Sequence, residues 1–407
     1  MLLLKKRTSN LKTWSSTLHS LPLIRLLCKS KIKMQVYLDN AATTPMDAEV
    51  IEKMTQVMHD CYGNASAIHS QGRKARAVLE MARKDIAKLL NCASNELIFM
   101  GSGTEADNMA LRCAVNDLDV KHIITSEIEH KAVIDTAKEL KNKGTIELHF
   151  VKLDLYGRAD LDDLQNLASL YPNSLISLMH ANNELGTLND VAAISKIARA
   201  NHCYFHTDTV QTVGHYPIDL QVLDIDFLAC SAHKFHGPKG VGFLYKNKSL
   251  RIRPIVTGGG QESSMRAGTE NTTGIAGLAK ALEVAYRNID VKIETVYRLK
   301  AYFIDELLTQ IPGVCFNGDT SQDGGLYTVL NVSLPPTDNA STLLFQLDMN
   351  GICASGGSAC NSGAVNESHV LNGIKHPAER SAVRFSFSKF TTKEEIDFTI
   401  STLKELL

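Results

Sequence analysis

The strongest constraint on the fold is a regular alternation of short apolar runs with helical patterns. Helix-like stretches such as 71–90, 104–115 and 190–200 flank or separate most of these runs. Such alternation predicts an α/β fold with a seven-stranded, mostly parallel sheet covered by helices. The short spacing between the last two runs, through Gly237, Pro238 and Gly240, predicts a local exception to the alternation of strands and helices. The seven apolar runs are 96–100, 122–126, 147–151, 175–180, 203–208, 226–231 and 241–245.

The C-terminal third predicts a second, smaller α+β domain. A long helical pattern runs from about residue 271 to 308 and leads into it. Beyond it the sequence indicates strand, helix, strand and helix, at 326–334, 340–349, 382–388 and 393–406. We therefore expect four parts: a basic extension (1–33), an N-terminal segment (34–46), a large domain (47–292) and a small domain (293–407).

The charge of the chain is unevenly distributed. Of its 43 Lys and Arg residues, eight fall in positions 1–33, which hold no Asp or Glu, and the rest of the chain carries an excess of acidic residues. That body gives no electrostatic reason to bind nucleic acid. The extension reads either as a transit peptide or as sequence upstream of a true start at Met34. We favour the second because an apolar strand begins at Val36, so we expect a cytoplasmic protein, with a mitochondrial one as the alternative.

The cysteine pattern and the hydropathy exclude several classes. Nine Cys residues, without CxxC pairs, form neither a disulfide framework nor a zinc pattern. They suit a reducing compartment in which a free thiol can react. No apolar run reaches the roughly 18 residues that a membrane span needs, so we expect neither a membrane protein nor a resident metal.

Three local features together indicate a site for a phosphorylated aldehyde cofactor. A Gly-rich turn at 101–104 precedes a helix and could cradle a phosphate, although such turns usually serve only as turns. Asp208 ends an apolar run with Gln211 one turn later, and it could hold a ring nitrogen or simply cap a helix. Lys234 follows an apolar run and Ser-x-His, where an amine could form a Schiff base or merely reach solvent. All three are what pyridoxal 5'-phosphate (PLP) requires.

Eight short motifs follow one another along the chain, at 37–45, 126–133, 182–186, 231–240, 258–260, 266–269, 357–360 and 383–386. In these motifs the chain resembles the NifS/IscS-type cysteine desulfurases, a family of fold-type I PLP enzymes that act as homodimers. The resemblance covers nearly everything from Tyr37 onward. It implies removal of sulfur from L-cysteine, leaving alanine and a persulfide for a sulfur-acceptor protein such as an iron–sulfur scaffold.

The resemblance assigns a role to each matching residue. Lys234 would carry the cofactor, Asp208 would pair with its ring nitrogen, and His130 would stack on the ring and move a proton. Arg384 would clamp the substrate carboxylate. The other expected contacts are Gln211 and Asn183 near the phenolic oxygen, Gly103, Thr104, Ser231 and His233 at the phosphate, and Thr269 at the phosphate of the neighbouring subunit.

Cys360 distinguishes this chain from an ordinary aminotransferase. It lies among Gly, Ser and Ala residues at 354–364, which predicts an exposed loop rather than a core strand. We expect its thiolate to accept the sulfur and to be a transient cluster ligand at most. Cys353 is a weaker candidate because it ends an apolar run. The doubled Gly356-Gly357 lengthens the loop relative to the family and leaves the identity of the acceptor open.

Two other functions remain open from the sequence. A selenocysteine lyase shares this fold and cofactor, and selenocysteine turnover would identify it. A non-catalytic sulfur-handling PLP protein is a different class, but the presence of Lys234, Asp208, His130 and Cys360 argues against it.

Overall fold

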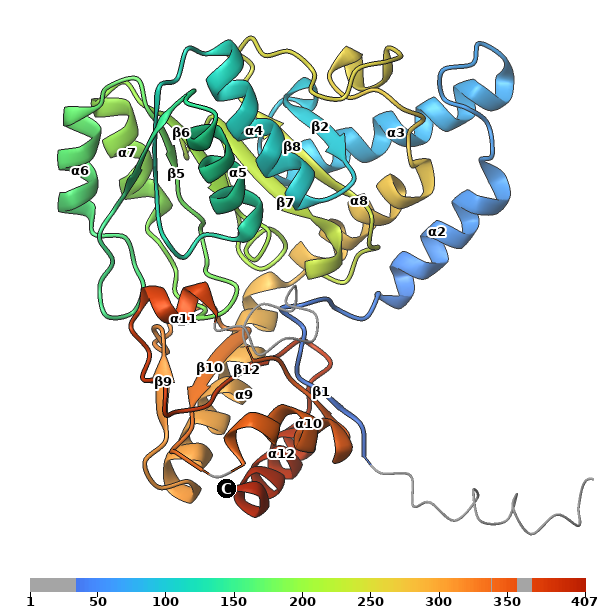
Figure 1. The fold of residues 1–407 in the computed structure, drawn as a ribbon. Helices are drawn as coiled ribbons and strands as arrows, with labels where there is room; N and C mark the ends of the chain where they lie inside the picture. The colour runs from blue at the N-terminus through green and yellow to red at the C-terminus, as the bar shows by residue number, and fades with distance from the viewer. Residues whose placement is uncertain (1–33, 338, 357–367) are drawn as a thin grey trace, which may run out of the picture.

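A computed structural model describes residues 34–337, 339–356 and 368–407. In Figure 1 the large sheet and its helices form one lobe, and the segment from α9 (Ile289–Gln310) onward forms most of a second lobe. The N-terminal strand β1 (Val36–Tyr37) lies in the second lobe, because it pairs in parallel with β11 (Ile352–Cys353). The second lobe therefore contains segments from both ends of the chain.

The large sheet has seven strands, as the apolar runs predict. Their order across the sheet is β2-β8-β7-β6-β5-β3-β4. Only a short 3-10 turn (Ala232–Lys234) lies between β7 and β8, which confirms the predicted exception to the strand–helix alternation, and β8 runs antiparallel to both of its neighbours. The strands are β2 (Leu97–Met100), β3 (His122–Thr125), β4 (Glu147–Phe150), β5 (Leu175–Ser177), β6 (Tyr204–Asp208), β7 (Phe227–Ser231) and β8 (Gly242–Lys246).

Helices cover both faces of this sheet, because successive strand residues point to opposite sides. Ile98 packs with α4 and α5, whereas its neighbours Leu97 and Phe99 pack into the cluster formed with the helices of the other face. Each face therefore buries its own apolar cluster. The helices of this lobe are α2 (Ala48–Asp60), α3 (Ser70–Leu89), α4 (Gly103–Asp117), α5 (Lys131–Asn142), α6 (Leu161–Leu170), α7 (Val191–Ala200) and α8 (Thr272–Tyr286).

The second lobe has its own apolar cluster around a three-stranded antiparallel sheet, ordered β12-β10-β9. Val36 and Leu38 belong to this cluster, so the N-terminal segment packs with the C-terminal part of the chain. The elements are β9 (Cys315–Asn317), β10 (Val329–Ser333), β12 (Ala382–Ser386), α10 (Leu343–Met349), α11 (His369–Gly373) and α12 (Lys393–Leu406).

The prediction of one continuous helix over 271–308 is wrong in one respect. The chain breaks between α8 and α9 at Asn288, which adopts a left-handed conformation with φ 54°. Asn tolerates this conformation better than most residues, so the break has a local cause. The predicted domain boundary at 292/293 falls inside α9 and stays a prediction. Among the described residues, no helix is long and apolar enough to span a membrane.

Candidate functional site

A single cavity opens at the carboxyl ends of the large-sheet strands, where open α/β sheets bind their ligands. The strands β6 and β7 end there at Asp208 and Ser231, and α4 begins there at Gly103. Ten of the predicted site residues line this cavity, although they come from six separate parts of the sequence. They are Gly103, Thr104, His130, Asn183, Asp208, Gln211, Ser231, His233, Lys234 and Arg384.

The Gly-rich turn forms one wall. Ser102 caps α4, and its hydroxyl accepts a hydrogen bond from the Glu105 amide at 3.2 Å. The first amides of a helix have no acceptor within it, and the helix dipole makes them attractive to an anion. A Cβ at Gly103 would lie 2.5 Å from the Val210 side chain, so only glycine fits this close approach. The wall suits a phosphate held by backbone groups.

His233 faces the same wall as a neutral imidazole. Burial and, to a lesser extent, the positive charges of Lys234 and Lys239 lower its pKa to about 4. Its Nδ1 lies 3.2 Å from the Thr43 hydroxyl. A neutral ring beside the helix start can donate one hydrogen bond to an anion without carrying a charge of its own.

Asp208 lies buried at the end of β6. Burial raises the pKa of its carboxyl group, and the charges of His130 and Lys234 offset only part of this effect. One carboxylate oxygen accepts a hydrogen bond from the Val210 amide at 2.9 Å. The alternative role as a helix cap is wrong, since a turn rather than a helix follows. A cationic group in the cavity would stabilise the ionised form of this side chain.

Lys234 ends a short 3-10 turn (Ala232–Lys234) directly after β7. Its Nζ donates hydrogen bonds to the backbone carbonyls of Ala41 at 2.6 Å and Ala42 at 3.0 Å. Gln211 donates to the same Ala41 carbonyl through its side-chain amide at 3.1 Å. The N-terminal segment therefore fixes the amine in the cavity and keeps it from reaching freely into solvent.

His130 caps α5 and points into the cavity. Its Nδ1 accepts a hydrogen bond from the Ala132 amide at 3.2 Å, so Nε2 carries the proton when the ring is neutral. A ring nitrogen of His130 and carboxylate oxygens of Asp107 and Asp208 all lie within 4.8 Å of one another. The imidazole is therefore placed to exchange a proton close to two acidic groups.

Arg384 is fully buried on β12 at the junction of the two lobes. Its guanidinium donates to the Asn183 carbonyl and to the Asp39 carboxylate, both at 2.9 Å. Its Nε has no hydrogen-bond partner among the described residues. A buried donor without an acceptor costs free energy, so the group is suited to receive a second carboxylate.

The sequence analysis missed three carboxylates around this cavity. Asp39 pairs with Arg384 at the junction of the lobes. Asp107 lines the cavity. Its burial and, to a lesser extent, the negative charges of Asp208 and Glu129 raise its pKa. Burial likewise raises the pKa of Glu129 to about 8, although the Ser126 hydroxyl and the Met179 amide oppose the change. Asp39 and Glu129 lie within the motifs at 37–45 and 126–133, and Asp107 follows the Gly-rich turn, but no sequence feature gave any of them a role.

The remaining predicted residues lie elsewhere. Thr269 lines a separate pocket together with Gly101 of the Gly-rich turn and does not line the cavity of its own chain. Cys353 lies exposed at the end of β11. The partial desolvation of its thiol and the negative charges of Asp348 and Asp39 raise its pKa. Cys360 and Gly357 lie outside the described residues, and the described chain stops at Gly356 on one side and resumes at Ser368 on the other.

Both of these flanking segments are tied to the cavity. The Ser355 hydroxyl donates to Asp39 at 2.8 Å, and the Ser355 backbone pairs with Arg384. Ser368 donates to the buried Glu184, the residue after Asn183. The chain on either side of Cys360 is thus anchored beside the groups that line the site.

Comparison with known proteins gives this arrangement a family. The aminotransferase class-V family matches residues 36–398. A cysteine desulfurase IscS from Dictyoglomus turgidum is 43% identical over 380 residues, which cover 92% of this chain and 95% of that protein. A solved NifS-like protein superposes with a TM-score of 0.84 at 35% identity and covers 91% of this chain and 99% of its own. The structure titled SspA in complex with cysteine has a TM-score of 0.75 at 30% identity, with coverage of 88% and 100%. The chain belongs to the aminotransferase class-V family and, within it, to the IscS/NifS cysteine desulfurases.

Proposed function

We propose that this protein is a PLP-dependent cysteine desulfurase that moves sulfur from L-cysteine to Cys360 and releases alanine. One observation carries the proposal: Lys234, Asp208, the Gly-rich turn and Arg384 meet in one cavity. The names of the relatives and the cysteine-bound neighbour support the choice of reaction and substrate.

The cavity residues fit PLP by their chemistry. Asp208 is a buried carboxylate with a raised pKa, and a ring N–H⁺ would stabilise its ionised form. The start of α4 at Gly103, with Ser231 and His233, offers donors for the phosphate, and Lys234 offers the Schiff-base amine. When bound, PLP supplies an electron sink for charge that develops at the substrate Cα.

The protein's own groups then divide the work. Lys234 would act as the base for the substrate Cα proton, and its contacts with the Ala41 and Ala42 carbonyls hold it within the cavity. His130 presents its Nε2 proton toward the site. Arg384 binds the substrate carboxylate with donors that now serve Asp39 and Asn183.

Cys360 is the proposed sulfur acceptor. Its thiolate attacks the substrate sulfur, the bond from that sulfur to Cβ breaks, and the carbon fragment keeps the electron pair and becomes alanine after protonation. Cys360 follows Gly356 by four residues, which span at most about 14 Å. Ser355 is hydrogen-bonded to Asp39, which pairs with Arg384, so this reach starts beside the group that would bind the substrate carboxylate.

The proposal includes two partners. A homodimer would bring Thr269 of one subunit to the phosphate of the other, which agrees with its position away from its own cavity. A sulfur-acceptor protein, such as an iron–sulfur scaffold, would take the persulfide sulfur.

The test measures alanine and sulfide released from L-cysteine with dithiothreitol, with selenocysteine assayed in parallel. The variant Cys360→Ser should keep its yellow cofactor but release no sulfide. The control Cys315→Ser changes an exposed thiol outside the cavity and should behave as the wild type. Equal activity of Cys360→Ser and the wild type would exclude Cys360 as the acceptor and point to Cys353.

A further inference from the structure

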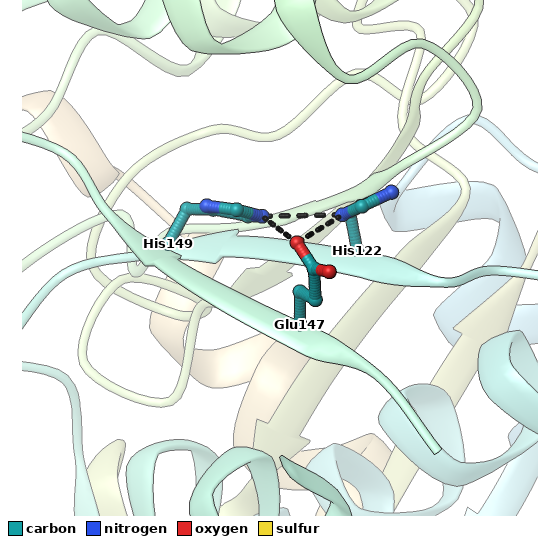
Figure 2. A group of neighbouring side chains, drawn as sticks. All are labelled: His122, Glu147 and His149. Carbon is teal, nitrogen blue, oxygen red and sulfur yellow. Dashed lines mark hydrogen bonds and ion pairs between the residues drawn. The ribbon is translucent and has the colours of Figure 1, made fainter. Parts of the chain in front are cut away.

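A second cluster of ligand-type side chains lies far from the cavity, on the edge of the large sheet. His122 begins β3, and Glu147 and His149 lie two residues apart on β4, the edge strand. The two strands are parallel, with His122 directly beside Glu147. Since strand residues alternate between faces, all three side chains lie on the same face. Figure 2 shows them pointing toward one another.

The three ligand atoms are close together. Nδ1 of His122 lies 3.2 Å from Nε2 of His149, and the Glu147 carboxylate lies 3.6 Å from the first nitrogen and 3.9 Å from the second. Zinc binds imidazole nitrogen and carboxylate oxygen at about 2.0–2.2 Å in tetrahedral geometry, which places two ligand atoms roughly 3.3–3.5 Å apart. The nitrogen pair already has nearly this spacing. The Glu147 side chain is 70% exposed, so it can move the remaining few tenths of an ångström.

We propose that His122, Glu147 and His149 form a binding site for a divalent transition-metal ion, with Zn²⁺ as its best match. Two imidazoles and one carboxylate are a ligand set that zinc uses when a fourth position stays open to water or another ligand. Because Glu147 is exposed, that fourth position faces solvent.

The surroundings prepare the two rings for a metal. The ring of Tyr171, which follows α6, stacks on His149 with ring centroids 3.9 Å apart and planes 20° apart. The same tyrosine ring lies 4.7 Å from the His122 ring, so it restrains both imidazoles from one side. Without a metal, one ring nitrogen must donate to the other, which leaves a weaker link between the strands.

The location separates this site from the proposed reaction. His122 and Glu147 are the first residues of their strands, whereas the cavity lies at the carboxyl ends. A bound ion would join the edge strand β4 to β3 and so stabilise the border of the sheet. It would take no part in the chemistry at Lys234.

The test is equilibrium dialysis of the full-length holoenzyme against Zn²⁺, with the metal content per chain measured for four proteins. The wild type and the control His59→Gln, an exposed histidine on α2, should bind one more Zn²⁺ per chain than His149→Gln. Loss of even an outer-shell partner typically weakens metal binding by about 10–100-fold, so loss of His149 should weaken it at least that much. Zinc bound by thiols is common to all four proteins and cancels in the comparison.

The fourth protein, Glu147→Gln, keeps the proposal testable if His149→Gln does not fold, because Glu147 is an exposed residue of the edge strand. It should bind the ion at least about tenfold more weakly than the wild type. Zn²⁺ should also raise the unfolding temperature of the wild type more than that of Glu147→Gln. Equal zinc content in all four proteins would overturn the proposal and leave the cluster as a hydrogen-bonded histidine pair.

Discussion

Lys300 is a buried cation whose replacement by methionine should make the protein more stable. The residue lies on α9 and is fully buried, and its Nζ donates one hydrogen bond to the Leu326 carbonyl at 3.0 Å. Burial lowers its pKa from 10.5 to about 8, and the charge of Asp319 offsets only part of that effect. The folded protein therefore holds a charged amine that water would solvate better.

The size of the effect follows from the pKa. One pKa unit corresponds to about 1.4 kcal/mol, so the difference between 10.5 and about 8 makes the charged amine cost about 3 kcal/mol near pH 7. Methionine has a similar shape and loses one neutral hydrogen bond, worth about 1 kcal/mol. The Leu326 carbonyl stays satisfied, because it also accepts from the Val329 amide. We expect Lys300→Met to raise the free energy of unfolding by about 2 kcal/mol at pH 7.

The pH dependence gives the decisive check. Between about pH 8 and pH 10.5 the unfolded chain keeps the Lys300 proton while the folded protein has lost it, so the stability of the wild type rises with pH in this window. The advantage of Lys300→Met should therefore shrink above pH 8 and vanish at about pH 9.5, and above about pH 10.5 the variant should be less stable by about 1 kcal/mol, the value of the lost hydrogen bond. Urea unfolding followed by circular dichroism at pH 7 and pH 10 measures this, with the exposed Lys53→Met as control. A loss of stability at pH 7, or an advantage that does not change with pH, would refute the reasoning.

Three further predictions concern the cavity. Asp208→Ala should lower desulfurase activity by more than about 100-fold, as measured by alanine release. Thermal unfolding should show that the cofactor-free variant is no less stable than the cofactor-free wild type, because the variant no longer buries a carboxyl group with a raised pKa. Gly103→Ala should weaken PLP retention by about 5–150-fold in dialysis, since overpacking against Val210 costs about 1–3 kcal/mol, and unchanged retention would argue against the phosphate cradle. Arg384→Lys should reduce kcat/KM for L-cysteine by about 10–150-fold, mostly through a higher KM, because Lys replaces two charge-assisted donors with a point charge. Steady-state kinetics at equal PLP content measure this loss, and a smaller loss would argue against Arg384 as the carboxylate-binding residue.

The sheet could be predicted from sequence because its signal is local. Each strand is an apolar run, and every predicted run contains one of the observed strands or overlaps it closely. The break at Asn288 was missed because the apolar pattern continues on both sides of it, and one backbone conformation decides the direction of α9. The pairing of β1 with β11 was missed because residues more than 300 positions apart carry no local sign of contact.

The site residues likewise fall into those that the local sequence identifies and those that only distant contacts reveal. Motifs identified residues at or just after the ends of strands, such as Asp208 and Lys234, because open α/β sheets bind their ligands at these ends. They did not identify Asp39, whose contact with Arg384 spans 345 positions. Nor did they show that the backbone of Ala41 would hold the Lys234 amine.

These distant contacts decide the chemical state of the groups that the motifs identify. A lysine at the end of a strand is an ordinary surface cation unless another segment closes over it, and here the N-terminal segment supplies the two carbonyls that bind its Nζ. A carboxylate such as Asp208 has an ordinary pKa unless its surroundings exclude water, and here burial raises that pKa. Tertiary packing therefore sets protonation and orientation at this site, while the local sequence sets only which residues are available.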